Sequence, residues 1–155
     1  MAVGTVSYLG SELYVTSIDA EKPTEADKIS YWRSVSGIRG ITKEAIEAEC
    51  TDGDGYSFWT TGKRAQQETV VDVNYIDKNG IAILDEFAEA SGQDEVCKIW
   101  FKPTNLIGDE TIRGFCSTAI ITDRAERTAD SSTAQGASYT FKKSGKPLKW
   151  DGSVG

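Results

Sequence analysis

Residues 42–62 read TKEAIEAECTDGDGYSFWTTG, and the two halves of this stretch follow different patterns. Over residues 42–50 apolar and charged side chains alternate, with Ile46, Ala48 and Cys50 on one face and Lys43, Glu47 and Glu49 on the other. A period of two predicts a half-buried β-strand with one wet face. The Asp-Gly pairs at 52–55 favour tight turns, because glycine accepts a positive φ without steric penalty. We therefore expect a strand that leads into a long connection over residues 51–65.

The same alternation recurs in other segments that are rich in β-branched and aromatic residues, namely 66–76, 95–102, 111–122 and 136–142. The segments 95–102 and 111–122 are separated by the turn-like NLIGDE, so we expect them to form a hairpin. In 95–102, the alternation sets Cys97, Ile99 and Phe101 against Val96, Lys98 and Trp100. The sequence therefore predicts a mainly β fold with antiparallel strands.

One segment follows the helical period instead. In GIAILDEFAEASG, residues 80–92, the residues Ile81, Leu84 and Phe87 recur at helical spacing. We expect Asn79 to cap the start of this helix and Gly92 to take the left-handed position at its end. A helical turn is also expected at 23–28, before a strand at Tyr31-Trp32. The fold class is then an antiparallel β-sandwich or barrel-like domain with one flanking α-helix and long assembly loops.

The length of 155 residues fits a single domain, 1–155, with its own hydrophobic core. We expect three peripheral parts: an N-terminal segment 1–12, the long loop 51–65 and a C-terminal arm 142–155. The polar segment 123–135 contains no large apolar residue and is expected to be a mobile loop.

Charge and cysteine content exclude several classes of protein. The net charge of −7 argues against a protein that binds DNA or an anionic membrane through charge. Cys50, Cys97 and Cys116 lie singly in apolar stretches, which indicates buried free thiols in a reducing compartment. The first residues lack a basic region and a long apolar run, so we expect no signal peptide and no membrane span.

The residue types needed for common catalytic and metal sites are missing. The chain has no histidine, which removes Ser-His-Asp and Cys-His arrangements and the commonest transition-metal ligand. The stretch 52–55 resembles the start of a calcium loop, but aligning it places Cys50 at the first ligand position and Thr61 at the twelfth. We expect no catalytic residue, no metal and no cofactor; carboxylate-only chemistry is an alternative that sequence leaves open.

The connection 51–65 carries three aromatic residues, Tyr56, Phe58 and Trp59, which need to be covered. Either another molecule covers them or they fold back on the core of their own chain. A local basic patch, made of Lys142, Lys143, Lys146 and Lys149, could dock on the acidic face of a neighbouring copy. The candidates for contacts between subunits are Tyr56, Phe58, Trp59, Lys63, Arg64, Lys146 and Trp150.

The order of these segments resembles a known family. The run WRSVSGI at 32–38, the strand 42–50, the glycine-rich loop 52–62, the strand 66–76, the turn at 77–80 and the helix with Leu84 facing inward occur in that order. The close of the core, YTF at 139–141 followed by SGKP at 144–147, completes the likeness. From about residue 30 to 147 the chain resembles the tail tube proteins of long-tailed bacteriophages, in the tail tube and Hcp-like superfamily.

The resemblance implies a virion protein that assembles with itself in the host cytoplasm. Its subunits would form hexameric rings stacked into a hollow tail tube through which viral DNA passes without specific binding. The loop 51–65 would reach the adjacent ring, and Glu47, Glu49 and Asp72 would line the lumen, where negative charge lets DNA slide. Other implied partners are the tape measure, tail tip and tail terminator proteins. The rival interpretation is a monomeric carbohydrate-binding β-sandwich that uses Trp59 and Tyr56 as a stacking platform.

Overall fold

A computed structural model describes residues 11–38, 40–51, 53, 55–103, 114–127 and 135–155, with the backbone alone for 48–51. The strands in these ranges are β1 (Glu12–Ser17), β2 (Lys28–Ile29), β3 (Trp32–Ser36), β4 (Ile41–Thr51), β5 (Ser57–Gln66), β6 (Thr69–Asn74), β7 (Val96–Lys102), β8 (Gly114–Arg127) and β9 (Gly136–Trp150). The helical elements are α1 (Lys78–Glu89) and the 3-10 turns η1 (Glu25–Asp27) and η2 (Gly92–Glu95). In the described ranges, no helix is long and apolar enough to cross a membrane.

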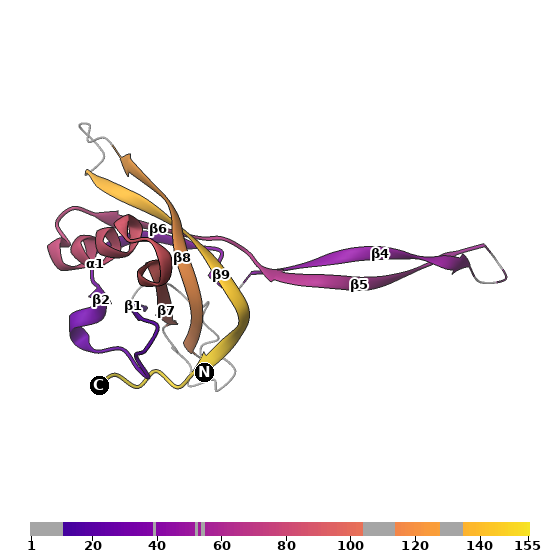
Figure 1. Ribbon diagram of the computed structural model, residues 1–155, viewed down its shortest axis with the longest axis horizontal. Coiled ribbons are helices and arrows are strands. Elements are labelled where there is room, and N and C mark those ends of the chain that lie inside the picture. The colour runs from indigo at the N-terminus through magenta and orange to yellow at the C-terminus, as the bar shows by residue number, and fades with distance from the viewer. Residues whose placement is uncertain (1–10, 39, 52, 54, 104–113, 128–134) are drawn as a thin grey trace, which may run out of the picture.

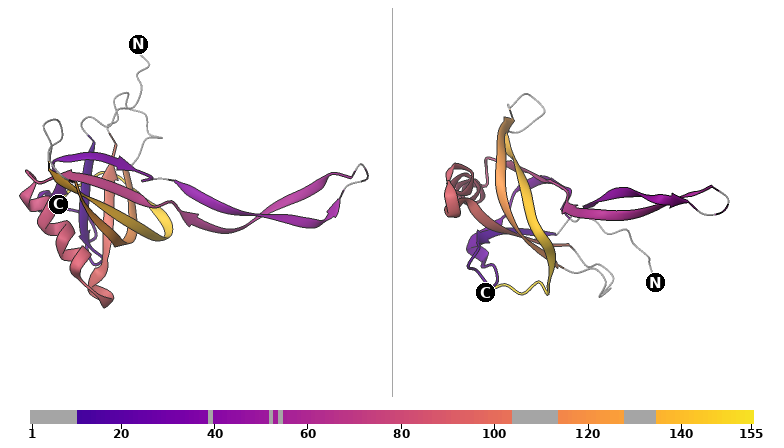
Figure 2. Two further views of the ribbon diagram at one scale, coloured as in Figure 1. Left: turned by 90° about the horizontal axis from the view of Figure 1, so that it is seen from above. Right: turned by 45° about the vertical axis from the view of Figure 1, so that its right-hand side comes forward.

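Within the described residues, seven strands form one antiparallel sheet in the order β2-β1-β7-β8-β9-β6-β3. Strand β7 pairs with β8 only up to Ile120, and β6 pairs with β9 only up to Phe141. Strands β8 and β9 pair along most of their length, with register shifts at Cys116/Thr118 and Ile121/Asp123. Bulges of this kind let a strand bend from one layer into another. The sheet therefore curls, and its two ends face each other across the core (Figures 1 and 2).

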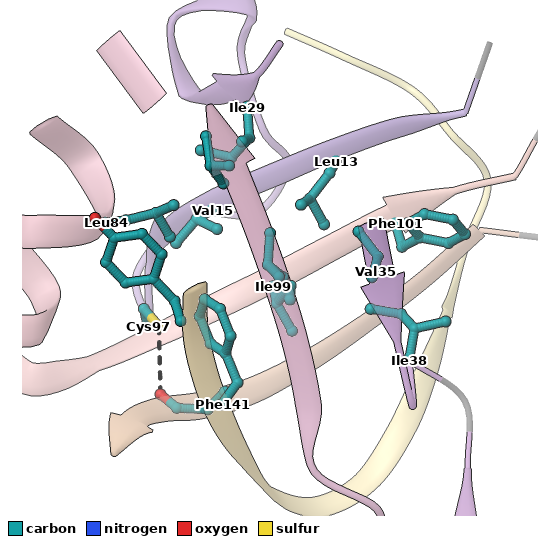
Figure 3. Close-up of a cluster of buried hydrophobic side chains, with 14 of the residues drawn as sticks. Leu13, Val15, Ile29, Val35, Ile38, Leu84, Cys97, Ile99, Phe101 and Phe141 are labelled. Atoms are coloured by element: carbon teal, nitrogen blue, oxygen red, sulfur yellow. Dashed lines mark hydrogen bonds between the residues drawn. The ribbon is translucent and has the colours of Figure 1, made fainter. Parts of the chain in front are cut away.

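The core lies between the two ends of the curled sheet, as Figure 3 shows. Leu13 and Val15 of β1 and Ile99 of β7 contribute from one end, and Val71 and Val73 of β6 contribute from the other. All five are almost completely buried. The predicted antiparallel β-sandwich or barrel-like class with one flanking helix is confirmed by this arrangement.

Helix α1 covers one side of the sheet and places Leu84 in the core. Its expected caps are wrong. The N-cap is Asp77, whose Oδ1 accepts a 2.9 Å hydrogen bond from the Gly80 amide, whereas Asn79 donates its side-chain amide to the Ala26 carbonyl. Gly92 has a φ of 66°, but the C-cap is Ala90 and Gly92 opens the following 3-10 turn.

Strands β4 and β5 form a separate two-stranded sheet that projects far from the body (Figure 1). The prediction of a long loop over 51–65 is therefore wrong, because β5 occupies residues 57–66. The predicted half-buried strand at 42–50 is a strand, but the described side chains from 41 to 47 are all exposed. An alternating pattern predicts that the apolar face of a strand packs on the core, but the apolar face of β4 does not pack on the body.

Other elements also have boundaries that differ from the predicted ones. Residues 142–150 continue strand β9, so only 151–155 lie beyond it and the C-terminal arm is much shorter than predicted. Strand β8 extends to Arg127, into the expected mobile loop, whose residues 128–134 lie outside the described ranges. The N-terminal segment ends where β1 begins at Glu12, and its residues 1–10 also lie outside them. Residues 114–122 of the predicted strand 111–122 belong to β8 and pair antiparallel with the strand at 95–102, as expected, whereas 111–113 lie outside the described ranges. The helical turn predicted at 23–28 is present as η1.

Trp100 departs from the simple inside–outside pattern. It lies on the face of β7 opposite Cys97 and Ile99, yet it is buried in a second, smaller cluster with Tyr14, Cys116 and Trp150. The rings of Trp100 and Trp150 meet edge to face, with centroids 5.5 Å apart. Cys97 and Cys116 are buried free thiols, as expected, and the side chain of Cys50 lies outside the described residues.

Candidate assembly surface

Five of the nine exposed large hydrophobic side chains of the described residues lie on the β4–β5 hairpin. Tyr56, Phe58 and Trp59 have 72%, 50% and 65% of their surface exposed. The interpretation in which these aromatics fold back on their own core is therefore wrong. Ile41 and Ile46 are exposed on the same hairpin, and sequence reasoning missed them because it placed Ile46 on a buried face.

Both faces of the hairpin carry apolar side chains. Residues directly opposite each other in an antiparallel pair project from the same face, and neighbours along a strand project from opposite faces. Trp59 stands opposite Glu47, whereas Thr60 stands opposite Ile46, so Trp59 and Ile46 lie on different faces. Phe58, two residues from Thr60, shares the face of Ile46. A partner that covers one face would leave the other exposed.

A lysine and a glycine fix the chain where it leaves the body for the hairpin. The Nζ of Lys143 donates to the carbonyl oxygens of Gly37 and Ile38, both at 2.8 Å. Burial lowers the pKa of Lys143 to about 8. Gly37 has a φ of 71°, and a Cβ there would collide with the carbonyl oxygen of Glu68. Only glycine fits this turn without strain.

The two strands of the hairpin are also tied together and to β9 at the base. The Gln67 amide donates to the Gly40 carbonyl at 2.8 Å. The Gln66 side chain donates through Nε2 to Ser117 Oγ at 2.8 Å and to the Gly145 carbonyl at 2.9 Å. These bonds set the direction in which the hairpin leaves the body.

A cavity of about 470 Å³ opens beside this base, between β5 and the turn in β9. The described residues that line it are Ile41, Arg64, Ala65, Gln66, Lys143, Gly145, Lys146 and Pro147. The structure thus brings together two predicted contact residues, Arg64 and Lys146, whereas Lys63 is exposed on the hairpin and does not line the cavity. Gln66 Oε1 is buried there and has no hydrogen-bond partner within the described residues.

The described residues hold no group of three or more cysteine, aspartate or glutamate side chains arranged to bind a metal ion. Asp52 and Asp54, the two acids of the calcium-like stretch, lie outside those residues.

No protein-family model and no curated protein sequence matches the chain. Solved structures do match. A sheath/tube terminator of PVC, an extracellular contractile injection system, superposes with a TM-score of 0.67 at 19% identity over 96% of this chain and 99% of that chain. The sheath–tube complex of the same system gives 0.66 at 18% identity over 97% and 94%. The SPP1 tail tube gives 0.59 at 17% identity over 94% and 78%.

The chain has the tail tube fold. The likeness covers nearly all of the chain, so it extends into the residues before about 30, which the resemblance seen in the sequence did not include.

Within the tail tube fold, Trp150 is not available for contacts between subunits. Its ring is 6% exposed, packs edge to face on Tyr14 and Trp100, and donates its Nε1 hydrogen to the Ser153 carbonyl at 3.1 Å. We therefore remove it from the candidates. The alternation in 95–102 was the sequence signal for this burial of Trp150. It placed Trp100, on which Trp150 packs, on the face of β7 opposite the main core.

The three carboxylates expected in a lumen have different environments. Asp72 is held in ion pairs with Arg127 and, at 4.0 Å, with Arg33, so its charge is largely compensated within the subunit. The expectation that Asp72 faces a lumen stays a prediction, because an ion pair within the subunit does not fix its position in a ring. Glu47 is exposed on the hairpin face of Trp59, and the side chain of Glu49 lies outside the described residues.

Proposed function

We propose that this chain is a structural subunit of a phage or phage-like tail, and that copies of it assemble into rings stacked as a hollow tube. The observation that carries the proposal is the projecting hairpin with exposed aromatics on a tail tube fold. A two-stranded ribbon is marginally stable in water by itself. Covering a Phe-sized side chain contributes about 1.5–3 kcal/mol, so contact with other copies would stabilise both the hairpin and the assembly.

The finer parts of the proposal follow from the resemblance and the charge. We propose six subunits per ring. We also propose the tape measure, tail tip and tail terminator proteins as further partners. The net charge of −7 favours passage of DNA through the lumen without binding, with Glu47 and Glu49 as candidates to face it. The protein would be a non-enzymatic virion component, assembled in the host cytoplasm.

The test is electron microscopy of the purified protein at rising concentration. We expect stacked rings or tubes from the wild-type chain and none from the double variant Phe58→Ala with Trp59→Ala. A matched control, Thr60→Ala with Thr61→Ala, changes two neighbouring exposed residues of the same strand and should still assemble. Circular dichroism checks that each variant keeps its β fold. Normal tubes from the aromatic variant would contradict the role of the hairpin.

The same images separate two alternatives. Two matching structures are described as a terminator and a cap, so a chain that forms single rings and never stacks would be a terminator instead of a repeating subunit. A chain that stays monomeric and binds sugars through Tyr56 and Trp59 would be a carbohydrate-binding module.

A further inference from the structure

Two surfaces of opposite charge, neither of them paired within the described residues, lie on different sides of the molecule. Arg64 and Lys146 line the cavity at the base of the hairpin, which we call the basic pocket, and neither forms an ion pair with any described residue. No carboxylate belongs to the described lining of the basic pocket. In a chain with a net charge of −7, such a pocket is a local concentration of positive charge, which favours an anionic partner.

The basic pocket also contains a hydrogen-bond acceptor that no donor of the described residues reaches. Gln66 uses its amide hydrogens on Ser117 and Gly145, which leaves Oε1 buried and unpaired among the described residues. A buried acceptor without a donor is unfavourable, so an N–H group that reaches it is favoured. The pocket therefore fits an acidic surface that also offers a polar hydrogen, with Ile41 and Pro147 for its apolar part.

An acidic surface with those properties is present on the same chain. The end of α1 and the turn η2 carry Glu86, Glu89, Asp94 and Glu95, and no lysine or arginine occurs between residues 79 and 97. We call these four carboxylates the acidic corner. None of them forms an ion pair with a described residue, whereas Asp85 beside them is bound by Arg124.

The position of the acidic corner at a helix C-terminus makes it unfavourable within one subunit. The C-terminal end of a helix carries a partial negative charge and is normally matched with cations, but the last turn of α1 has none. A helix C-terminus without a matching cation is expected where that surface has a partner outside the chain. Gln93, between Glu89 and Asp94, adds a side-chain amide donor to the acidic corner.

We propose that the basic pocket of one copy receives the acidic corner of a second copy. Helix α1 lies on the side of the body away from the hairpin, so the two surfaces do not meet within one subunit (Figures 1 and 2). Two complementary surfaces on different sides of one chain give a head-to-tail contact, which closes into a ring when the rotation closes. This contact rests on the proposed assembly and defines a surface for it that is separate from the hairpin.

The test uses charge reversal in the full chain. Lys146→Glu should raise the concentration at which rings or tubes form by about tenfold or more, because it places like charges across the contact. Lys149→Glu is the matched control, because Lys149 belongs to the basic patch expected from sequence but, unlike Lys146, lies outside the lining of the basic pocket. The same charge reversal there should change that concentration less than about twofold. Adding Glu89→Lys to Lys146→Glu should restore most of the assembly.

A second measurement locates the contact directly. Carbodiimide treatment of assembled protein, mixed from ¹⁴N and ¹⁵N chains, should join Lys146 of one copy to a carboxylate of the acidic corner in another. Wild-type assembly with equal behaviour of Lys146→Glu and Lys149→Glu, or cross-links from Lys146 only to other carboxylates, would overturn this contact and leave the proposed function standing. A wild-type chain that stays monomeric at every concentration would overturn both.

Discussion

Asp77 is a buried carboxylate that joins three parts of the chain. Its Oδ1 accepts from the Gly80 amide at the start of α1, and its Oδ2 accepts from the amides of Ser30 at 2.7 Å and Tyr31 at 3.1 Å. It thus ties helix α1 to the segment between β2 and β3. Sequence reasoning selected Asn79 as the cap because both residue types cap helices, and only the fold shows which one faces the amides.

We predict that Asp77→Ala lowers the free energy of unfolding by about 2–4 kcal/mol, because it removes a cap and leaves buried amides unpaired. Asp77→Asn should cost less, since one acceptor oxygen remains. Asn79→Ala, the control, loses one exposed bond to Ala26 and should cost about 1 kcal/mol or less. Urea denaturation measures all three, and equal losses at the two positions would contradict the assignment of the cap.

Lys143 gives the stability a specific dependence on pH. Burial lowers its pKa from 10.5 to about 8 in the folded chain. Between these two values the unfolded chain binds more protons than the folded one, so the contribution of Lys143 to stability rises with pH. Below pH 8 both states are protonated, and the cost of burying the charge is fully present.

We therefore predict that the free energy of unfolding of the wild type, relative to Lys143→Met, increases as pH is raised from 8 to 10. Urea denaturation at closely spaced pH values measures this difference, and the exposed position gives the control variant Lys149→Met. If the two variants show the same pH profile relative to the wild type, the burial of Lys143 at the hairpin base is wrong.

The hairpin is an element that the body does not need for its own core. None of the described residues from 41 to 66 belongs to either buried cluster. The two strands meet at the base through the bond between Gln67 and Gly40, and Thr42 stands opposite Ala65. The ends left by a deletion would therefore already be close together.

We predict that replacing residues 43–64 by Asn-Gly, a two-residue hairpin turn, leaves a folded monomer. Its thermal midpoint should stay within a few degrees of the wild-type value, because the seven-stranded sheet is intact, whereas tubes should no longer form. Differential scanning calorimetry and electron microscopy measure the two properties. Loss of the folded transition would show that the hairpin contributes to the body.

Secondary structure could be predicted from sequence where the side chains that form the pattern pack within the same chain. Alternation in 95–102 and helical spacing in 80–92 gave the correct element types, because those side chains pack on the same chain. Strand β5, SFWTTGKRAQ, was missed because its apolar residues do not alternate regularly. Its Phe58, Trp59 and two threonines carry a high β-propensity, and this was the signal that could have found it.

The candidate site was harder to predict than the fold. Tyr56, Phe58 and Trp59 could be selected because aromatics between glycines are conspicuous, and they are exposed. The cavity at the hairpin base could not be predicted from sequence. Its lining residues Gln66, Lys143 and Gly145 come from strands that only the topology brings together. Trp150 was selected wrongly, because the second cluster that buries it depends on the register of β8 and β9.

At the scale of the whole molecule, two opposing features would govern the proposed assembly. The net charge of −7 makes copies repel one another, which opposes association of the dilute chain. The hairpin projects well beyond the body (Figure 2), and its apolar side chains are exposed, so in the proposed assembly they would meet another copy before the two bodies come close. Association should therefore begin at the hairpin and depend on its aromatics.

Tryptophan fluorescence can follow this step, because the four tryptophans differ in exposure. Trp100 and Trp150 are buried and Trp32 is half-buried, whereas Trp59 is largely exposed. We predict that acrylamide quenches wild-type emission strongly at low concentration and much less after assembly, with a shift of the emission to shorter wavelength as Trp59 leaves water. Trp59→Phe keeps an aromatic ring at this position, so it should assemble without the change in quenching. If wild-type tubes form and acrylamide still reaches Trp59 as it does in the monomer, the hairpin is not covered by another copy.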